Sequence, residues 1–502
     1  MFWVLLRREI LAHLITFRFA ITVVVCLLLV ATTTFIRIDD YEQRLANYNT
    51  ARDAHRDELL STRTYSFLKP NVERPPNPLS IFNTGMDSRL GNTLRIYYTH
   101  VPVLWDAQSH NTGNFFLDFF YRIDLVFIFQ FVLSLLALLF AYDAIAGERE
   151  NGTMRLTMSH PIRRGSILAA KYIGAMTCLI LPLIISFTTA LIWTVLTGSI
   201  IFSGNDFLRI AGILLTSIIY LSVIYLIGLL ISACAHRTAT ALILSLFIWV
   251  VLVLIYPSLS VSVIDQLTKP QRSRIDSSYD AMRQIRLAVN EAEMEYLKND
   301  GVEGESEHFN LNGFRDSLHI GVGQKNILMR IDFKAYDWQH ITPESEKSVS
   351  HVVRYHQFLT PLRIDAAEKI GLVRLPALEQ LRFQRARVAR NLLRLSPAAM
   401  YNLATQAWAG TDLYGVVDFF ETARQYRRTL INYFYDKDAF SSRQWFASDK
   451  GAIDLDDFPR FVYQRADLST NASRALPDLQ LLLLLNVALF LATFAIFVRQ
   501  EI

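Results

Sequence analysis

The chain has 502 residues, of which 52% are hydrophobic and 19% are charged, and its mean hydropathy is positive. This balance is too apolar for an ordinary soluble protein and too charged for a chain buried entirely in a bilayer, so we expect both membrane-spanning and water-exposed parts. The formal net charge of +4 is small for this length and gives no support for nucleic-acid binding. The three cysteines lie in apolar runs, which excludes a disulfide framework in the polar regions and a zinc-binding spacing.

Residues 1–14 are predicted to form an amphipathic interfacial helix on the cytoplasmic face of a membrane. Trp3 lies on its apolar side together with Leu6 and Ile10, whereas Arg7, Arg8 and Glu9 lie on another side. We expect the apolar side to enter the acyl boundary and the arginines to face anionic lipid headgroups. A simpler alternative is that Arg7 and Arg8 act only as a positively charged topology signal.

Six later runs are long and apolar enough to cross a hydrocarbon core of roughly 30 Å as helices. Their central stretches contain no Asp, Glu, Lys, Arg or His. This absence disfavours an ion- or proton-driven carrier, because such carriers keep an ionisable group near the bilayer midplane. Six helices that only anchor outer domains are an alternative, although anchoring would not need six. The predicted spans are 15–36, 123–145, 172–197, 209–235, 239–264 and 478–498.

Lysine and arginine in the short loops predict the orientation of these spans. Basic residues precede the first span, fill the loop after the second, follow the fourth and end the chain, whereas the loop 202–208 has none. We therefore expect a multi-pass protein of the plasma membrane, with both termini and residues 146–171 in the cytoplasm. Segments 37–122 and 265–477 are then extracytoplasmic.

Residues 146–171 form a charged, turn-rich segment between the second and third spans. Gly152 favours a turn, Thr153 can cap a short following helix, and Pro161 ends that helix. Arg163, Arg164 and Lys171 are predicted to hold the start of the third span at the inner headgroups. The segment is longer than a connection requires, which suggests that it docks on a partner.

The two outer segments show helical patterns. Residues 37–66 read as a polar helix, 70–80 as an extended proline-rich linker, and 275–297 and 411–436 as helices with one apolar stripe. Ser396 and Pro397 form a helix start. The arginines between 374 and 394 are interpreted as a solvated, salt-bridged face, with anionic headgroups or glycans as alternative ligands. His340, His351 and His356 are interpreted as surface residues, and no metal site or catalytic set is predicted.

Several short stretches resemble one family. Residues 148–153, Glu-Arg-Glu-Asn-Gly-Thr, and the following Leu156, Pro161 and Arg164 are similar to the loop between the second and third spans of ABC-2 type transporter permeases. Residues 74–82 with Gly85, and 395–397 with 409–412, resemble the subgroup that carries a large extracytoplasmic insertion of unknown function before the last span.

This resemblance implies an α-helical polytopic membrane protein similar to the type V exporters, whose loop 146–171 forms a coupling helix in a cleft of a separate ABC ATPase subunit. The chain would carry no cofactor, because ATP and magnesium would bind to the ATPase. Partners would be two ATPases, a second permease subunit of the same or a different chain, and membrane lipid. The implied function is ATP-driven export of an unidentified substrate from the bacterial cytoplasm across the inner membrane. The implied ATPase-coupling residues are Glu148, Arg149, Glu150, Gly152, Thr153, Arg155, Leu156, Pro161 and Arg164.

The sequence itself agrees with a separate ATPase, since it lacks a Gly-x-x-x-x-Gly-Lys-Ser/Thr phosphate-binding loop. Two alternatives to export stay open. In the first, ATP hydrolysis drives mechanical work of the outer domains on a lipid or protein partner, without transport. In the second, the chain is a membrane-anchored adhesion or assembly protein with no ATPase partner.

Overall fold

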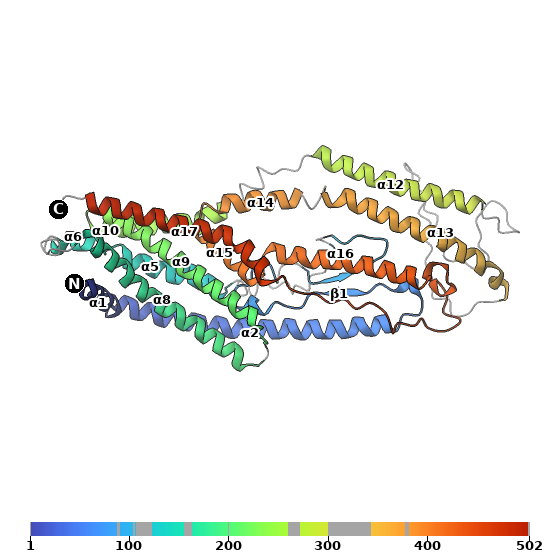
Figure 1. Ribbon diagram of the computed structural model, residues 1–502, viewed down its shortest axis with the longest axis horizontal. Coiled ribbons are helices and arrows are strands. Elements are labelled where there is room, and N and C mark those ends of the chain that lie inside the picture. Colours follow the sequence, from blue (N-terminus) through green and yellow to red (C-terminus); the bar gives the residue numbers. More distant parts are fainter. Residues whose placement is uncertain are drawn as a thin grey trace.

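The computed structural model describes residues 2–87, 91–103, 106, 123–154, 163–198, 200–259, 272–299, 343–376 and 381–499. The molecule is elongated, with a bundle of long helices at one end and a slender extension at the other (Figure 1). Both chain ends lie at the free end of the bundle, beside helices α1 and α6. We call this the basal end, and we call the extension built around α12, α13 and α16 the distal rod.

Within the described part of the chain, six helices are long and apolar enough to cross a membrane, which confirms the predicted polytopic helical fold. The first, α2, extends unbroken for 44 residues, so the first span and the polar helix predicted after it are one element. The second and fifth spans each contain a short π-helical segment, η3 and η4. The bundle helices are α1 (Phe2–Leu14), α2 (Phe17–Leu60), α4 (Leu125–Ile128), η3 (Phe129–Leu133), α5 (Ser134–Ala141), α6 (Ala146–Glu150), α8 (Arg164–Leu196), α9 (Gly204–Cys234), α10 (Thr238–Trp249), η4 (Val250–Ile255) and α17 (Leu468–Arg499).

The bundle core is built around α5 and α9, whose apolar side chains are mostly buried. Helix α15 (Pro397–Ala409), from the outer segment, packs against α9 and α17 and contributes Tyr401 to this core. The Tyr401 ring stacks on that of Tyr220 with centroids 4.5 Å apart, and its hydroxyl is 2.8 Å from Ser217 Oγ. From its sequence this stretch belongs to the outer segment 265–477, and nothing in its residue pattern predicts that it enters the bundle.

The start of α15 follows the predicted pattern. Ser396 Oγ accepts a hydrogen bond from the amide of Ala399, and Pro397 occupies the first turn. The helix ends at Gly410, whose φ of 68° lies in the left-handed region that glycine adopts most easily.

The distal rod consists of long helices and a small antiparallel sheet. Its core gathers aromatic residues such as Phe434 and Trp445. His356 is buried here and stacks on Phe446, so its interpretation as a surface residue is wrong. The elements are η1 (Tyr65–Phe67), β1 (Asn71–Glu73), η2 (Pro78–Ile81), β2 (Thr93–Arg95), α12 (Arg272–Asn299), α13 (Pro343–Arg374), α14 (Leu381–Leu393), α16 (Leu413–Asp436), η7 (Ala439–Ser441) and η8 (Arg443–Trp445), with Val72 opposite Leu94 in the sheet.

Candidate coupling surface and outer joint

Lys171 of α8 is a buried lysine at the basal end. Its side chain is only 4% exposed, and Nζ donates to Glu148 Oε1 at 2.8 Å and to Glu9 Oε1 at 3.2 Å. The prediction that Lys171 holds the third span at the headgroups is therefore wrong. Burial of an ammonium group is tolerated here because two carboxylates, from α6 and α1, converge on it. We call Glu9, Glu148 and Lys171 the basal triad.

Arg149 and Glu150, which follow Glu148 in α6, bind the ends of neighbouring helices. Arg149 donates to the carbonyls of Ala233 and Ala235, at the carboxyl end of α9, where the helix dipole favours a cation. Glu150 Oε2 accepts hydrogen bonds from the amide and the hydroxyl of Thr238, at the amino end of α10, where the dipole favours an anion. Both charged side chains thus connect α6 to the bundle.

The junction between α5 and α6 is attached to α9 by one side chain. Ser232 Oγ accepts hydrogen bonds from the amides of Ile145 and Ala146 and donates to the carbonyl of Tyr142. A displacement of α6 must therefore displace α9 or break this three-way contact.

After α6 the chain turns outward. Asn151, Gly152 and Thr153 are exposed, and Gly152 has a φ of 71° with open space around it. Thr153 Oγ1 donates back to the Glu148 carbonyl. We call residues 151–153 the exposed turn. Three of the predicted coupling residues, Arg155, Leu156 and Pro161, lie outside the described residues.

Beyond the exposed turn, Arg164 begins α8 and donates to the carbonyl of Val498 near the end of α17. Hydrogen bonds and ion pairs of the predicted coupling residues therefore reach α8, α9, α10 and α17, and Lys171 continues the contact of Glu148 to α1.

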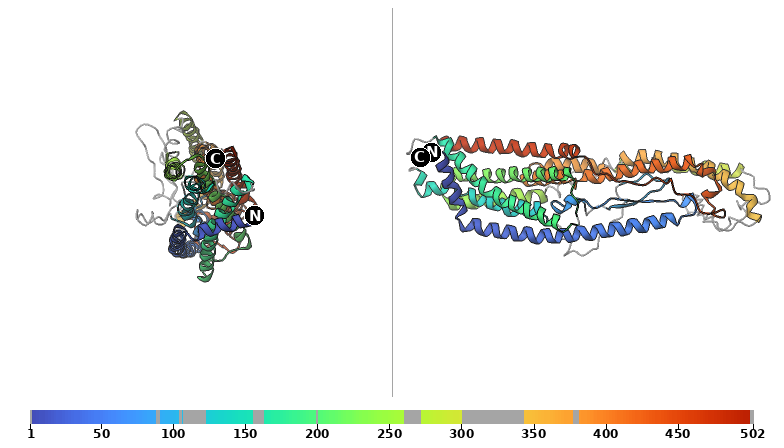
Figure 2. Two further views of the ribbon diagram at one scale, coloured as in Figure 1. Left: turned by 90° about the vertical axis from the view of Figure 1, so that its left-hand side faces the viewer. Right: turned by 60° about the horizontal axis from the view of Figure 1, so that its bottom comes forward.

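Helix α1 lies across the basal end at a steep angle to α2 (Figure 2). One of its faces packs on α8, where a Cβ on Gly174 would lie 2.9 Å from the Cβ of Glu9. The His13 ring lies against Phe140 in a tilted contact, with centroids 4.5 Å apart. Burial lowers the pKa of His13 to about 4, with Asp143 opposing the shift and Lys171 adding to it. Leu6 is buried on this side, so the prediction that it enters the acyl boundary is wrong. Trp3, Arg7 and Arg8 lie on the exposed side.

At the other end of the spans, a buried carboxylate joins three segments. Asp206, in the first turn of α9, is fully buried and accepts hydrogen bonds from Arg209 at 3.0 Å and, through both oxygens, from Arg465 at 3.1 Å. Arg465 lies just before α17, and it also contacts Asn77 of the first outer segment. We call Asp206, Arg209, Arg465 and Asn77 the outer joint.

The two outer stretches that carry the resemblance meet at this joint. Asn77 donates to the carbonyl of Ala409, and the amide of Met86 donates to the carbonyl of Thr411. Gly85 approaches so closely that a Cβ there would lie 2.4 Å from the Thr411 carbonyl oxygen. The sequence showed these stretches to be distinctive, but it did not show that they touch.

Asp478 of α17 is a further residue that sequence reasoning missed. It is fully buried and accepts hydrogen bonds from Arg390 and Arg394 of the α14 region. The interpretation of this arginine stretch as salt-bridged is confirmed for these two residues, but their contacts hold α14 against α17 instead of forming a solvated face. In the part of the chain that the structure describes, no group of three or more His, Cys, Asp or Glu side chains is arranged to hold a metal ion.

Comparison with known proteins shows which family the chain is similar to. The sequence pattern of the ABC-2 family transporter proteins matches residues 3–499. A stretch of 126 residues, 25% of this chain, is 32% identical to the probable ABC transporter permease protein NosY of Stutzerimonas stutzeri and covers 46% of that protein. Over 60 residues, 12% of this chain, the identity to the probable ABC transporter permease protein NosY of Pseudomonas aeruginosa is 45%, covering 22% of that protein. The chain thus spans less than half the length of the curated relatives it matches.

Proposed function

This chain belongs to the family of ABC-2 family transporter proteins, and we propose that it is the membrane permease subunit of an ATP-driven transporter whose ATPase activity resides on separate subunits. In this proposal the basal end faces the cytoplasm of a bacterial cell and the distal rod projects from the outer face of its inner membrane. The large outer segment before α17 is consistent with the subgroup that carries such an insertion. A second permease subunit, identical or different, completes the assembly.

The observation that carries the proposal is the set of hydrogen bonds and ion pairs that attach α6 to its neighbouring helices. A loop that only connected two spans would not need three consecutive residues, Glu148, Arg149 and Glu150, that make one ion pair with a buried lysine and two helix-end contacts. An ATPase that pushes on the exposed turn would move α6, and the contacts of Lys171, Arg149 and Ser232 would carry that movement to α1, α8 and α9. In this proposal, each cycle of ATP hydrolysis exports a substrate across the membrane.

A second candidate function is mechanical transmission without transport. The observation that favours it is the direct attachment of the rod to the spans: α2 enters the rod without a break, and α15 packs inside the bundle. Movement of the spans would then reach the rod directly and could act on a lipid or protein partner outside the membrane.

Docking is tested by bulky substitution in the exposed turn. Charge reversal of Glu148 or Glu150 would be ambiguous, because both side chains hold the bundle together. The double variant N151W/T153W alters only exposed positions and should lose most co-purifying ATPase, with an unchanged elution profile of the permease itself. T50W, at an exposed position of α2 in the rod, should keep the ATPase. Equal recovery of ATPase with the unmodified protein, N151W/T153W and T50W would rule out docking at the exposed turn.

Export and mechanical transmission are separated by reconstituting the complex in vesicles and measuring ATP hydrolysis. Stimulation by a compound that also accumulates on the far side of the vesicle membrane supports export. Stimulation by an outer protein partner alone, with no accumulation of any compound, supports mechanical transmission.

A further inference from the structure

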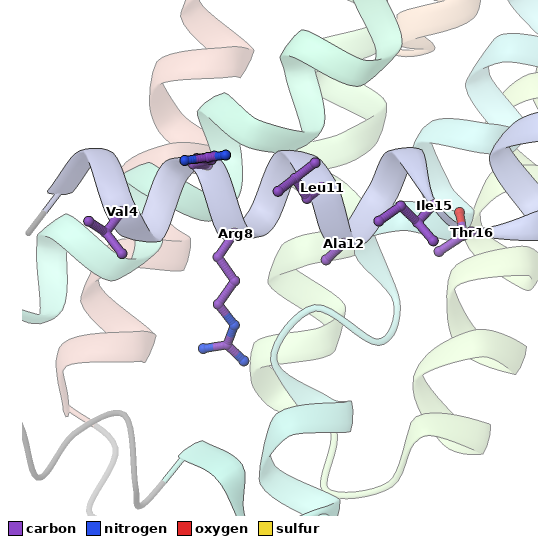
Figure 3. Close-up of a pocket in the computed structure, with 7 residues that line it drawn as sticks. Val4, Arg8, Leu11, Ala12, Ile15 and Thr16 are labelled. Atoms are coloured by element: carbon purple, nitrogen blue, oxygen red, sulfur yellow. The ribbon is translucent and has the colours of Figure 1, made fainter.

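A small cavity lies inside the outer joint. Its volume of about 10 Å³ gives room for one water-sized particle, which excludes a phosphate or a carboxylate ligand. Unlike the open groove along the exposed side of α1 (Figure 3), this cavity is lined by residues none of which is exposed. Its walls come from the first outer segment, from α9, from the end of α15 and from the region where α17 begins.

The lining carries more positive than negative charge. Four of its residues are arginines, Arg74, Arg209, Arg465 and Arg474, whereas one is an aspartate, Asp87. Guanidinium groups stay protonated at all pH values that proteins meet, and a charge interacts more strongly inside a protein than in water. The cavity therefore repels a cation and attracts an anion.

The carboxylates nearby do not balance these four arginines. The arginines pair with three aspartates, Asp87, Asp206 and Asp418. Asp206 serves two of them, and Asp87 is also bound by Arg44 outside the cavity. Of the next carboxylates, Asp412 caps α16 through the amide of Gly415, and Asp467 is exposed to solvent. At least one guanidinium charge of the lining is thus left without its own partner.

Two of the guanidinium groups also have an unused hydrogen-bond donor. Arg74 and Arg209 are each 4% exposed, and the Nε of each is buried without a partner, although their terminal nitrogens are bound. Proteins rarely leave buried donors unmatched, which indicates that a ligand accepts from them. Asn471 also lines the cavity with an unpaired Oδ1, and the opposite orientation of this amide, with Nδ2 in its place, suits an anion.

We propose that this cavity binds one monovalent anion of the size of chloride. The anion accepts hydrogen bonds from Nε of Arg74 and of Arg209, and it neutralises the unbalanced guanidinium charge. A water molecule is the competing occupant, because it can accept from the same two donors. Water would leave a buried charge without compensation, which is costly in a protein interior.

The anion would connect the distal rod to the membrane spans. Arg74 directly follows β1 of the first outer segment, whereas Arg209 lies near the start of α9. Removal of the anion should therefore weaken this attachment and make the protein easier to unfold. The side chains of Arg465 and Arg474 are 31% and 18% exposed, so the anion can exchange with the solvent beside them.

The site is tested by thermal unfolding of the full chain in detergent at constant ionic strength. Chloride is replaced stepwise by gluconate, which is too large for the cavity. The unfolding midpoint should rise by roughly 1–3 °C with added chloride and should saturate at millimolar concentration. Bromide should have the same effect. A midpoint that does not depend on chloride would overturn the proposal and indicate that water occupies the cavity.

Conservative variants locate the effect. R74K and R209K keep the positive charge but lack the Nε donor, so each should lose most of the chloride-dependent rise. R443K alters an arginine of the rod that has its own ion pairs, and it should retain the rise. An equal response in R209K and R443K would show a general effect of salt and would overturn the site.

A second measurement decides if R74K and R209K fail to fold. The unmodified protein should broaden the chlorine NMR signal of the solution, and excess bromide should narrow the signal again by competition. Phosphate, which the cavity is too small to hold, should not narrow it. Equal narrowing by bromide and phosphate would contradict the site. No ATPase is present in either measurement, so their outcome is independent of the proposed function.

Discussion

The basal triad and the outer joint use opposite charges for the same task. At the basal end one buried lysine lies between two carboxylates, Glu9 and Glu148, whereas at the outer joint one buried aspartate lies between two guanidinium groups, Arg209 and Arg465. Each arrangement joins separate segments of the chain, and the most distant partners are Glu9 and Lys171 at the basal end and Asp206 and Arg465 at the outer joint.

The two differ in how many hydrogen bonds hold the central charge. Lys171 is 4% exposed and makes two charged hydrogen bonds, to Glu9 and Glu148. Asp206 has no exposed surface, receives both nitrogens of Arg465 and also caps its own helix through Ser203. We infer that the basal end is built to rearrange and the outer joint to hold.

The largest effect is expected from breaking the outer joint. D206N leaves Arg209 and Arg465 without a counter-charge and should lower the free energy of unfolding by about 3–5 kcal/mol. Thermal unfolding in detergent, followed by circular dichroism, measures the loss. D365N, which removes an exposed ion pair with Lys369, should cost at most about 1 kcal/mol. Equal effects of the two variants would show that the joint is not a structural centre.

Breaking the basal triad should cost less stability but more activity. In K171M the two carboxylates can be hydrated or protonated, so we expect a loss of about 1–3 kcal/mol. ATP hydrolysis by the assembled complex should fall strongly, because α1 and α6 are no longer connected. The triple variant E9Q/E148Q/K171M removes all three charges and should regain stability without regaining ATP hydrolysis. Recovery of both properties would contradict a role of the triad in coupling.

Alanine substitution of two glycines tests how closely the helices are packed in the bundle and at the basal end. In G212A the new Cβ would lie 2.5 Å from the Trp408 ring, between α9 and α15, and in G174A it would lie 2.9 Å from Glu9 Cβ, between α8 and α1. We expect unfolding to become easier by about 1–3 kcal/mol in both, with G212A nearer the upper limit because α15 is enclosed by the bundle. G204A has nothing within 4 Å of its new Cβ and serves as the control. A greater loss in G174A would reverse the proposed order of rigidity.

The long elements of this fold could be predicted from the sequence because they depend on local patterns. Apolar runs marked the six spans, and the apolar stripes at 275–297 and 411–436 marked α12 and α16. The partners of buried charges could not be predicted in this way. Lys171 pairs with Glu9 across 162 positions and Arg465 with Asp206 across 259, and no periodicity connects residues so far apart.

The same reason explains α15. Its composition resembles a short amphipathic helix of a soluble domain, and its contacts in space, such as the packing of Tyr401 on Tyr220, show that it belongs to the bundle. The exposed turn was recognisable because glycine and asparagine favour turns locally, whereas the attachment of Arg149 and Glu150 to α9 and α10 depends on contacts more than eighty residues apart.

Because α2 is uninterrupted, a small tilt of this helix produces a large displacement of its far end. Its 44 residues correspond to a stiff rod of about 66 Å at 1.5 Å per residue. If its basal end is held in place, each degree of tilt displaces the far end by about 1 Å. Leu60 would therefore move farther than the atoms at the basal end whose movement caused the tilt. The helix thus acts as a lever that increases the displacement and reduces the force. A partner bound to the rod would therefore experience a large displacement with a small force.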